Sequence, residues 1–224
     1  MRNEVLKEAI EIKKILKNEI PEIWDGKKCI LELREADFNW RQMEWIGWYF
    51  EYKARKVLIE NFGGQSGPAF GRTPMDYKNK FVWDFKAHPV NSPSHPWAIM
   101  NDCEAVNRCI EENNGIGFII ALGEAEYNDV EGSFKRWHSE LKGEQTKYVK
   151  ARIKRGAPSR KRKINFRIQD YLMIFLQDYN QIIRGMEERW LSGDAQTGWR
   201  NANGSPRRAK YKIKLNSIKK WAMV

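Results

Sequence analysis

The sequence lacks an uninterrupted apolar run of the length that a membrane-spanning helix needs, about 20 residues. Residues 1–17 form a charged amphipathic pattern, not the basic head and apolar core of a secretory signal peptide. We therefore expect a soluble cytoplasmic protein with no membrane partner.

Cysteine and histidine are scarce. The three cysteines (Cys29, Cys103 and Cys109) form no C-x-x-C pair and have no histidines at zinc-ligand spacing, so we expect reduced, packed thiols and no disulfide framework. The three histidines stand beside no recognisable nucleophile motif, which disfavours hydrolases that use a Ser or Cys triad. We expect His138 to be a solvated helix residue.

Acidic residues are missing from two segments. Residues 145–169 hold ten Lys or Arg and residues 195–224 hold eight, with no Asp or Glu in either. The formal charge is +11, yet the rest of the chain has 22 basic against 29 acidic residues, about −7. Such segregation indicates a polyanionic partner, most commonly nucleic acid; a basic surface that only aids solubility is the alternative. The candidate DNA-binding residues are Lys147, Arg152, Arg155, Arg160, Arg162, Lys163, Arg207 and Arg208.

One stretch, residues 74–88, predicts a β-hairpin. In its second half, residues 81–88, apolar and aromatic side chains alternate with Asp84, Lys86 and His88, the period of two that a strand requires. Residues 78–80 supply a plausible turn.

A hairpin folded about residue 80 places Asp76 opposite Asp84 and Pro74 opposite Lys86, so both carboxylates and the ammonium share one face. Like charges across a ladder destabilise it unless a cation lies between them. Hard oxygen ligands suit Mg²⁺, which uses one or two carboxylates beside water and phosphate. We therefore expect Asp76 and Asp84 to bind Mg²⁺, and Lys86 to orient or deprotonate the attacking water or to neutralise phosphate charge. A surface hairpin with solvated side chains is the alternative.

Pro74-x-Asp76 and Asp84-x-Lys86, the second pair on an apolar strand, resemble the PD-(D/E)xK signature of many type II restriction endonucleases. Met75 separates the proline from the aspartate, and the interval between the two halves is short for that family. The resemblance implies an α/β fold, a mixed central sheet flanked by helices with a restriction-endonuclease-like core.

Residues 37–61 predict a long helix before the hairpin, capped by Asp37 and closed by Gly63. Aromatic side chains surround its axis, so we expect it to be covered on most sides. In the family that this chain resembles, such a helix often gives a glutamate to the metal site. That makes Glu44 and Glu51, two turns apart, candidates for the catalytic site; pairing with neighbouring Lys or Arg is the alternative.

The remaining elements follow from apolar periodicity and turn residues, and residues 27–35 fit a strand or a helix equally well. We expect a single domain over residues 1–224 with a basic loop or ribbon at 147–163, helices at about 3–19, 103–112 and 131–141, a buried strand at 117–127, a largely helical region at 166–190 and a basic strand at 211–218.

Resemblance and charge together predict a Mg²⁺-dependent type II restriction endonuclease from a prokaryotic host, which hydrolyses phosphodiester bonds of double-stranded DNA at a short specific site. The resemblance also implies a homodimer, because a two-fold protein matches a palindromic site. Two alternatives remain: a structure-selective repair or recombination nuclease with the same core, and a non-catalytic nucleic-acid-binding protein. The lack of a zinc-finger or RNP motif disfavours the second.

Overall fold

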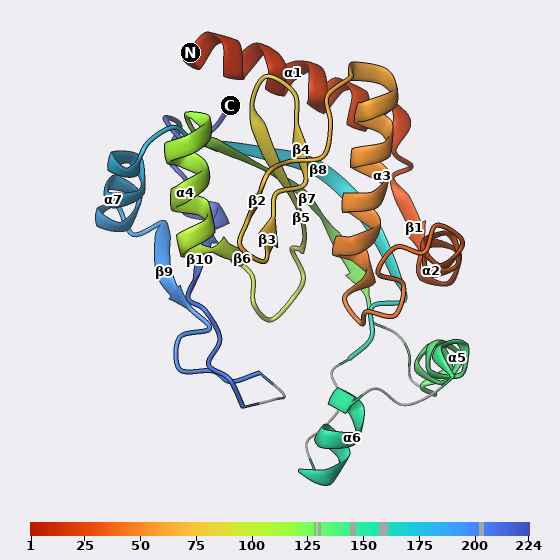
Figure 1. The fold of residues 1–224 in the computed structure, drawn as a ribbon. Coiled ribbons are helices and arrows are strands. Elements are labelled where there is room, and N and C mark those ends of the chain that lie inside the picture. Colours follow the sequence, from red (N-terminus) through yellow and green to blue (C-terminus); the bar gives the residue numbers. More distant parts are fainter. Residues whose placement is uncertain (128, 130, 144–146, 157–160, 202–203) are drawn as a thin grey trace.

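A curled mixed sheet of five strands lies at the centre of the computed structural model (Figure 1). The structure describes residues 1–224 apart from 128, 130, 144–146, 157–160 and 202–203, and at 147, 148, 151 and 152 it describes the backbone alone. In spatial order the strands are β1 (Ile23–Asp25), β8 (Asn165–Leu176), β7 (Ile116–Glu126), β5 (Val82–Pro89) and β4 (Tyr77–Lys78). β5 and β7 are parallel, and the other neighbours are antiparallel. The predicted α/β class with a mixed central sheet is confirmed.

One face of this sheet is covered by helices from the first part of the chain: α1 (Arg2–Glu19), α2 (Gly26–Glu35) and α3 (Trp45–Phe62). α1 buries Val5, Ile12 and Leu16, which recur at the spacing of one helix face. These side chains and those of α2 and α3 join Trp83 and Phe85 of β5 in a shared apolar core. Figure 1 shows α1 and α3 on this side of the sheet.

The opposite face carries a second core, to which Val82, Phe118 and Trp190 contribute. It is covered by α4 (Cys103–Asn113), α7 (Tyr179–Glu187) and a small antiparallel sheet of β6 (Trp97–Asp102), β10 (Lys210–Lys214) and β9 (Leu191–Ala195). The remaining elements are a short hairpin of β2 (Ala69–Phe70) and β3 (Thr73–Pro74), α5 (Ser133–Lys142), α6 (Lys147–Lys154) and a 3₁₀ turn at Leu215–Ser217.

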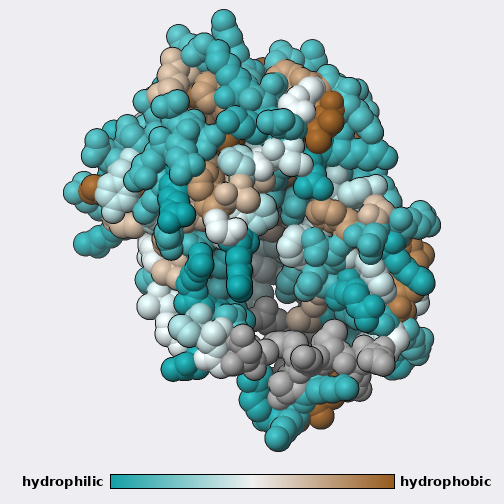
Figure 2. Space-filling view, in the orientation of Figure 1, coloured by the Kyte–Doolittle hydropathy of each residue, from teal (hydrophilic) through white to brown (hydrophobic). Residues whose placement is uncertain are grey.

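α5 with α6 and the connection between β9 and β10 extend from the sheet on two different sides (Figure 1). The space-filling view shows a hollow between these two sides, bordered by hydrophilic side chains (Figure 2). No helix in the described part of the chain combines the length and apolar composition that crossing a membrane requires.

Several predicted elements agree with the structure. β7 matches the predicted buried strand, and α1, α4 and α5 match predicted helices to within a few residues. Asp102 caps α4 by accepting hydrogen bonds from the backbone N–H groups of Glu104 and Ala105. The ambiguous residues 27–35 are helical, within α2.

The helix predicted to start at Asp37 begins later, at Trp45. Asp37 and Asn39 have φ angles of 49° and 43°, which belong to the left-handed region and cannot continue a right-handed helix. Glu44 is therefore the N-cap residue of α3 and not a residue on its side. The predicted end of the helix is confirmed, because Gly63 is the C-cap.

The prediction that residues 166–190 are largely helical is wrong. Residues 165–176 form β8, and only Tyr179–Glu187 is a helix. Phe166, Tyr171 and Phe175 enter one core while Ile174 and Leu176 enter the other, so apolar residues fall on both faces and hide the period of two. The predicted basic loop is also partly wrong, because α6 occupies its first half.

Candidate active site

The β4–β5 hairpin has the register predicted from the sequence. Tyr77 pairs with Trp83, with the turn centred on residue 80, and the same register brings Asp76 opposite Asp84. The Asp76 carboxylate accepts a 2.6 Å hydrogen bond from the backbone N–H of Phe85. A side chain thus takes the place of the next backbone partner in the ladder.

Pro74 does not lie opposite Lys86, as the sequence predicted, but pairs with Ala69 in the β2–β3 hairpin. Proline has no N–H to donate to a ladder, so pairing with β5 ends before this residue is reached. The chain segment ahead of Asp76 therefore turns away from β5.

Asp84 is 1% exposed, and both of its carboxylate oxygens accept hydrogen bonds. One accepts from the ammonium of Lys86, two residues further along the same face of β5. The other accepts from the side-chain amide of Asn101 on β6, which also lies 3.4 Å from the sulfur of Met75. The sequence interpretation missed Asn101, because β6 itself was not predicted and only the fold brings it to β5.

Lys86 keeps its proton in this setting. Burial alone lowers the pKa of its ammonium group, but the carboxylates of Asp84 and Asp76 outweigh that effect and raise the pKa overall. The ammonium also donates to the backbone oxygen of Phe85 at 3.2 Å. A protonated lysine can orient water or neutralise phosphate charge, but it cannot accept a proton. Deprotonation of the attacking water is therefore the least favoured of the predicted roles for Lys86.

Asp76 and Glu51 carry raised pKa values. Burial is the main cause for Asp76, which is 7% exposed, and the charge of Asp84 raises its pKa further. Burial raises the pKa of Glu51 on α3 to about 7, with Lys86 lowering it and Asp84 raising it. Asp76, Asp84, Lys86 and Glu51 therefore interact as one electrostatic group, which we call the acidic cluster.

Glu44 lies outside the acidic cluster. Its side chain is half exposed and forms an ion pair with Lys163, while the neighbouring Trp45 indole donates to the backbone oxygen of Lys163 at 2.8 Å. Of the two candidate glutamates, Glu51 is the one whose pKa is influenced by the charges of Lys86 and Asp84, whereas Glu44 lines an adjacent pocket.

Within the described residues, no group of three or more His, Cys, Asp or Glu side chains is arranged to hold a metal ion. Two aspartates nevertheless fit Mg²⁺, because this ion commonly takes one or two carboxylates and fills its other positions with water and substrate phosphate. Burial, and then the negative charge of Asp84, raise the pKa of Asp76, and a bound cation would compensate that negative charge. Asp76 and Asp84 are the residues that could hold the ion.

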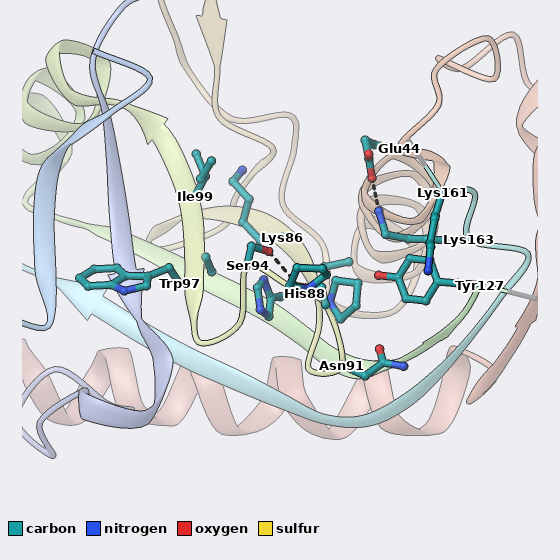
Figure 3. Close-up of a pocket in the computed structure, with 15 residues that line it drawn as sticks. Glu44, Lys86, His88, Asn91, Ser94, Trp97, Ile99, Tyr127, Lys161 and Lys163 are labelled. Atoms are coloured by element: carbon teal, nitrogen blue, oxygen red, sulfur yellow. Dashed lines mark hydrogen bonds and ion pairs between the residues drawn. The ribbon is translucent and has the colours of Figure 1, made fainter. Parts of the chain in front are cut away.

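A pocket of about 720 Å³ adjoins the acidic cluster, with Lys86 in its wall (Figure 3). The end of β5, the loop after it and the start of β6 form one part of the wall. Tyr127, Lys161 and Lys163 form another. No protein-family model, curated protein or solved structure matches this chain. The chemistry of the acidic cluster and of its surroundings therefore carries the functional argument.

A second, basic cavity of about 380 Å³ lies between the β2–β3 hairpin and the β9–β10 connection, and Arg72, Arg207, Arg208 and Lys210 line it. Burial lowers the pKa of Lys210, and the charge of Lys86 lowers it further, which indicates that this cavity is close to the acidic cluster. Arg207 and Arg208, predicted to contact DNA, thus lie near the cluster.

The predicted residues of the first basic segment are distributed differently. Arg155 is exposed just after α6, and Lys163 lies at the pocket rim. Arg162 is half-buried beside α5, where its charge adds to burial in lowering the pKa of Lys142 to about 8. The side chains of Lys147 and Arg152, and the whole of Arg160, lie outside the described residues.

His138 is not solvated, as the sequence predicted, but 1% exposed. One ring nitrogen lies 3.0 Å from the backbone oxygen of Trp40, and burial lowers the pKa of the ring to about 4. It is a packed residue of α5, away from the acidic cluster.

Proposed function

We propose that this protein is a Mg²⁺-dependent endonuclease that hydrolyses phosphodiester bonds of double-stranded DNA at a short specific site, as type II restriction endonucleases do. The observation that carries the proposal is the acidic cluster. Two buried aspartates lie opposite each other on a hairpin, and a protonated lysine pairs with one of them, Asp84. The charges of Asp84 and Lys86 also act on a helix glutamate, Glu51, whose pKa is raised mainly by burial.

The chain order around the cluster supports the proposal. A helix (α3) precedes the hairpin (β4–β5), and a crossover through β6 and α4 leads to β7, which is parallel to β5. This order fits the core of the restriction endonucleases that the sequence motif resembles, and we propose that this chain has such a core.

The residues of the cluster have distinct roles in this proposal. Asp76 and Asp84 would hold Mg²⁺, which when bound supplies a Lewis acid that stabilises the charge developing on the phosphate. The ammonium of Lys86 would orient the attacking water and offset negative charge on the phosphate. Asn101 would act as a positioning residue, because its amide holds one oxygen of Asp84. Glu51 would add a ligand or a nearby acid.

Basic residues on two sides of the cluster would hold the DNA backbone. Lys161 and Lys163 line the pocket on one side of Lys86, and Arg207, Arg208 and Lys210 line the basic cavity. Such contacts position a duplex but do not read its sequence. A homodimer belongs to the proposal as well, since two copies would cut both strands of a palindromic site.

One observation favours a structure-selective nuclease as a second candidate. The pocket beside Lys86 has a largely apolar floor. Intact duplex DNA presents its charged phosphates on the outside and has no exposed apolar group that could fill such a pocket. Discrete fragments from intact linear DNA would favour the restriction enzyme, and selective cutting of branched or bulged DNA would favour the second candidate.

The experiment is incubation of the purified protein with long linear duplex DNA, with and without Mg²⁺. We expect discrete fragments only with Mg²⁺, and none from the Asp84→Ala variant. The matched control is Asp170→Ala, which removes an exposed aspartate that pairs with Lys13 and Lys17 and should leave cutting unchanged. Intact DNA whose electrophoretic mobility is merely retarded would contradict the proposal and indicate a binding protein.

A further inference from the structure

The pocket of about 720 Å³ beside the acidic cluster has a size typical of sites that bind small organic groups. Lys86 belongs both to the cluster and to the pocket wall. Whatever occupies the pocket therefore lies next to the position that the scissile phosphate would take under the proposed function.

The buried part of the pocket lining, which we call its floor, is largely apolar. Its residues Pro89 and Ala98 offer no side-chain hydrogen-bond donors for a phosphate. In Figure 3 the indole of Trp97 and the ring of Tyr127 stand on opposite sides of the pocket, with His88 between them. Flat aromatic surfaces suit the face of another ring.

The rim of the pocket is cationic. Lys86, Lys161 and Lys163 line it, and Glu44 offsets part of the charge by pairing with Lys163. An apolar floor with aromatic rings beside it and ammonium groups at the rim matches a nucleotide, because the base would meet the rings while its phosphates would meet the lysines.

The pocket wall is preformed. The Asn91 side chain is bonded twice to the backbone of Ala125, at 2.8 and 3.0 Å, and this fixes the loop after β5 to the adjacent strand. The hydroxyls of Ser92 and Ser94 lie 2.9 Å apart in the same loop. Lys212 lies 5.0 Å from the ring centre of Trp97, within the range of a cation–π interaction. A ligand would therefore need to order few side chains of the pocket wall on binding.

We infer that this pocket receives one nucleotide of the DNA, extruded from the base stack next to the phosphate that is cut. In an intact duplex the bases present only their edges in the grooves, so they cannot stack on Trp97 or Tyr127. An extruded base presents its face to the rings. This inference rests on the proposed function: the enzyme extrudes the base from its site in intact duplex DNA, and it binds more tightly where that nucleotide is already unpaired, because no unpairing energy is then lost.

The test compares binding of the wild-type protein, in EDTA, to two duplexes that differ only by one unpaired adenine in one strand. We expect the bulged duplex to bind roughly tenfold or more tightly, as stacking of one base on aromatic side chains implies. Trp97→Ala should reduce this ratio to below about threefold. Tyr179→Ala, which truncates an exposed aromatic on α7 outside the pocket, should leave the ratio unchanged.

A second readout needs no variant. The unpaired adenine is replaced by 5-iodouracil, which cross-links to a stacked aromatic ring on irradiation, and the modified residue of the wild-type protein is mapped. Attachment at His88, Trp97 or Tyr127 supports the inference. Attachment elsewhere, or equal binding of the two duplexes, overturns it while leaving Mg²⁺-dependent cleavage as proposed. Failure to bind either duplex overturns both the inference and the proposed function.

Discussion

Two buried carboxylates lie on opposite faces of the same hairpin and are held in different ways. Glu8 of α1 is 6% exposed and accepts three hydrogen bonds from fixed N–H groups. These are the backbone N–H groups of Lys80 and Phe81, both at 3.2 Å, and the indole N–H of Trp83 at 2.8 Å. Glu8 thereby fastens α1 to the hairpin turn.

Asp84 is more deeply buried than Glu8, yet its surroundings stabilise its negative charge less well. Its partners are a flexible ammonium, Lys86, and an amide, Asn101. The neighbouring Asp76 and Glu51 have pKa values raised by burial and by the charge of Asp84. Negative charge is concentrated here without enough fixed donors to satisfy it.

The comparison teaches how to separate a structural carboxylate from a reactive one. Fixed N–H donors around an isolated carboxylate satisfy it and add stability. Several carboxylates around one lysine cost stability and persist where a cation or a substrate completes the site. We therefore expect changes at Glu8 to affect folding and changes in the acidic cluster to affect chemistry.

The largest effect is expected from Lys86→Ala. Loss of a positioned cation at the reacting phosphate should lower the cleavage rate by about 10³-fold, with DNA affinity nearly unchanged. Single-turnover cleavage and a binding titration measure the two quantities. Lys80→Ala is the matched control, since Lys80 lies on the same hairpin and its ammonium pairs with the exposed Glu4 side chain. If Lys86→Ala abolishes DNA binding together with cleavage, Lys86 is a structural residue.

Glu8→Ala should have the next largest effect, on stability. Removal of the carboxylate leaves buried N–H groups without a partner, so the free energy of unfolding should fall by about 2–4 kcal/mol. Urea denaturation measures this change. Cleavage per folded molecule should stay at the wild-type level. By contrast, Asp76→Asn should keep or raise stability, because it removes a carboxyl whose ionisation is opposed by burial and by the charge of Asp84. Equal destabilisation by Glu8→Ala and Asp76→Asn would contradict this difference between the two sites.

The pH dependence of stability tests the role of Glu51 in the acidic cluster. Its pKa of about 7 in the folded protein exceeds the usual value of 4.5, so between these pH values the folded state holds a proton that the unfolded chain has lost. Raising the pH through this window should therefore lower the free energy of unfolding, by up to about 3 kcal/mol. Denaturant unfolding of Glu51→Gln should lack this contribution, and parallel pH profiles for the two proteins would argue against a strained Glu51.

Mg²⁺ should oppose the fall in the free energy of unfolding that occurs as the pH is raised. A cation bound beside Asp76 and Asp84 favours ionised carboxylates and lowers their pKa values, so adding Mg²⁺ above pH 7 should restore stability to the wild type. The Asp84→Asn variant should respond less. An identical Mg²⁺ response of the two proteins would place the ion elsewhere.

The smallest expected effect concerns lysines outside both carboxylate sites. Lys161→Gln should flatten the salt dependence of DNA binding by about 0.9 units in a plot of log affinity against log salt, because one phosphate contact is lost. Lys13→Gln is the control, as Lys13 is occupied by Asp170 and the backbone oxygen of Tyr171. An unchanged slope for Lys161→Gln would remove the pocket rim from the DNA interface.

The hairpin register was predictable because it depends on local information. Alternation along residues 81–88 and a short turn suffice to bring Asp76 opposite Asp84. The candidate ligands could therefore be named from the sequence, whereas the predicted pairing of Pro74 with Lys86 is wrong because proline has no N–H with which to continue the ladder.

Other parts of the site depend on distant pairing. Asn101 reaches Asp84 because β6 pairs with β10, about a hundred residues later in the chain. The choice between Glu44 and Glu51 depends on where α3 starts, which the positive φ angles of Asp37 and Asn39 determine. No periodicity in the sequence carries such information. β8 was mistaken for a helix for a related reason, since burial on both faces removes the alternation that marks a strand.

The most direct measurement of the central claim applies one chemical change to both buried carboxylates. Asp84→Asn and Glu8→Gln each replace a carboxylate with an amide, and both proteins are incubated with long duplex DNA and Mg²⁺ at a temperature where they are folded. We predict discrete DNA fragments from Glu8→Gln and none from Asp84→Asn. Equal cutting by both variants, or cutting that persists without Mg²⁺, would contradict the assignment of the acidic cluster as a metal-dependent nuclease site.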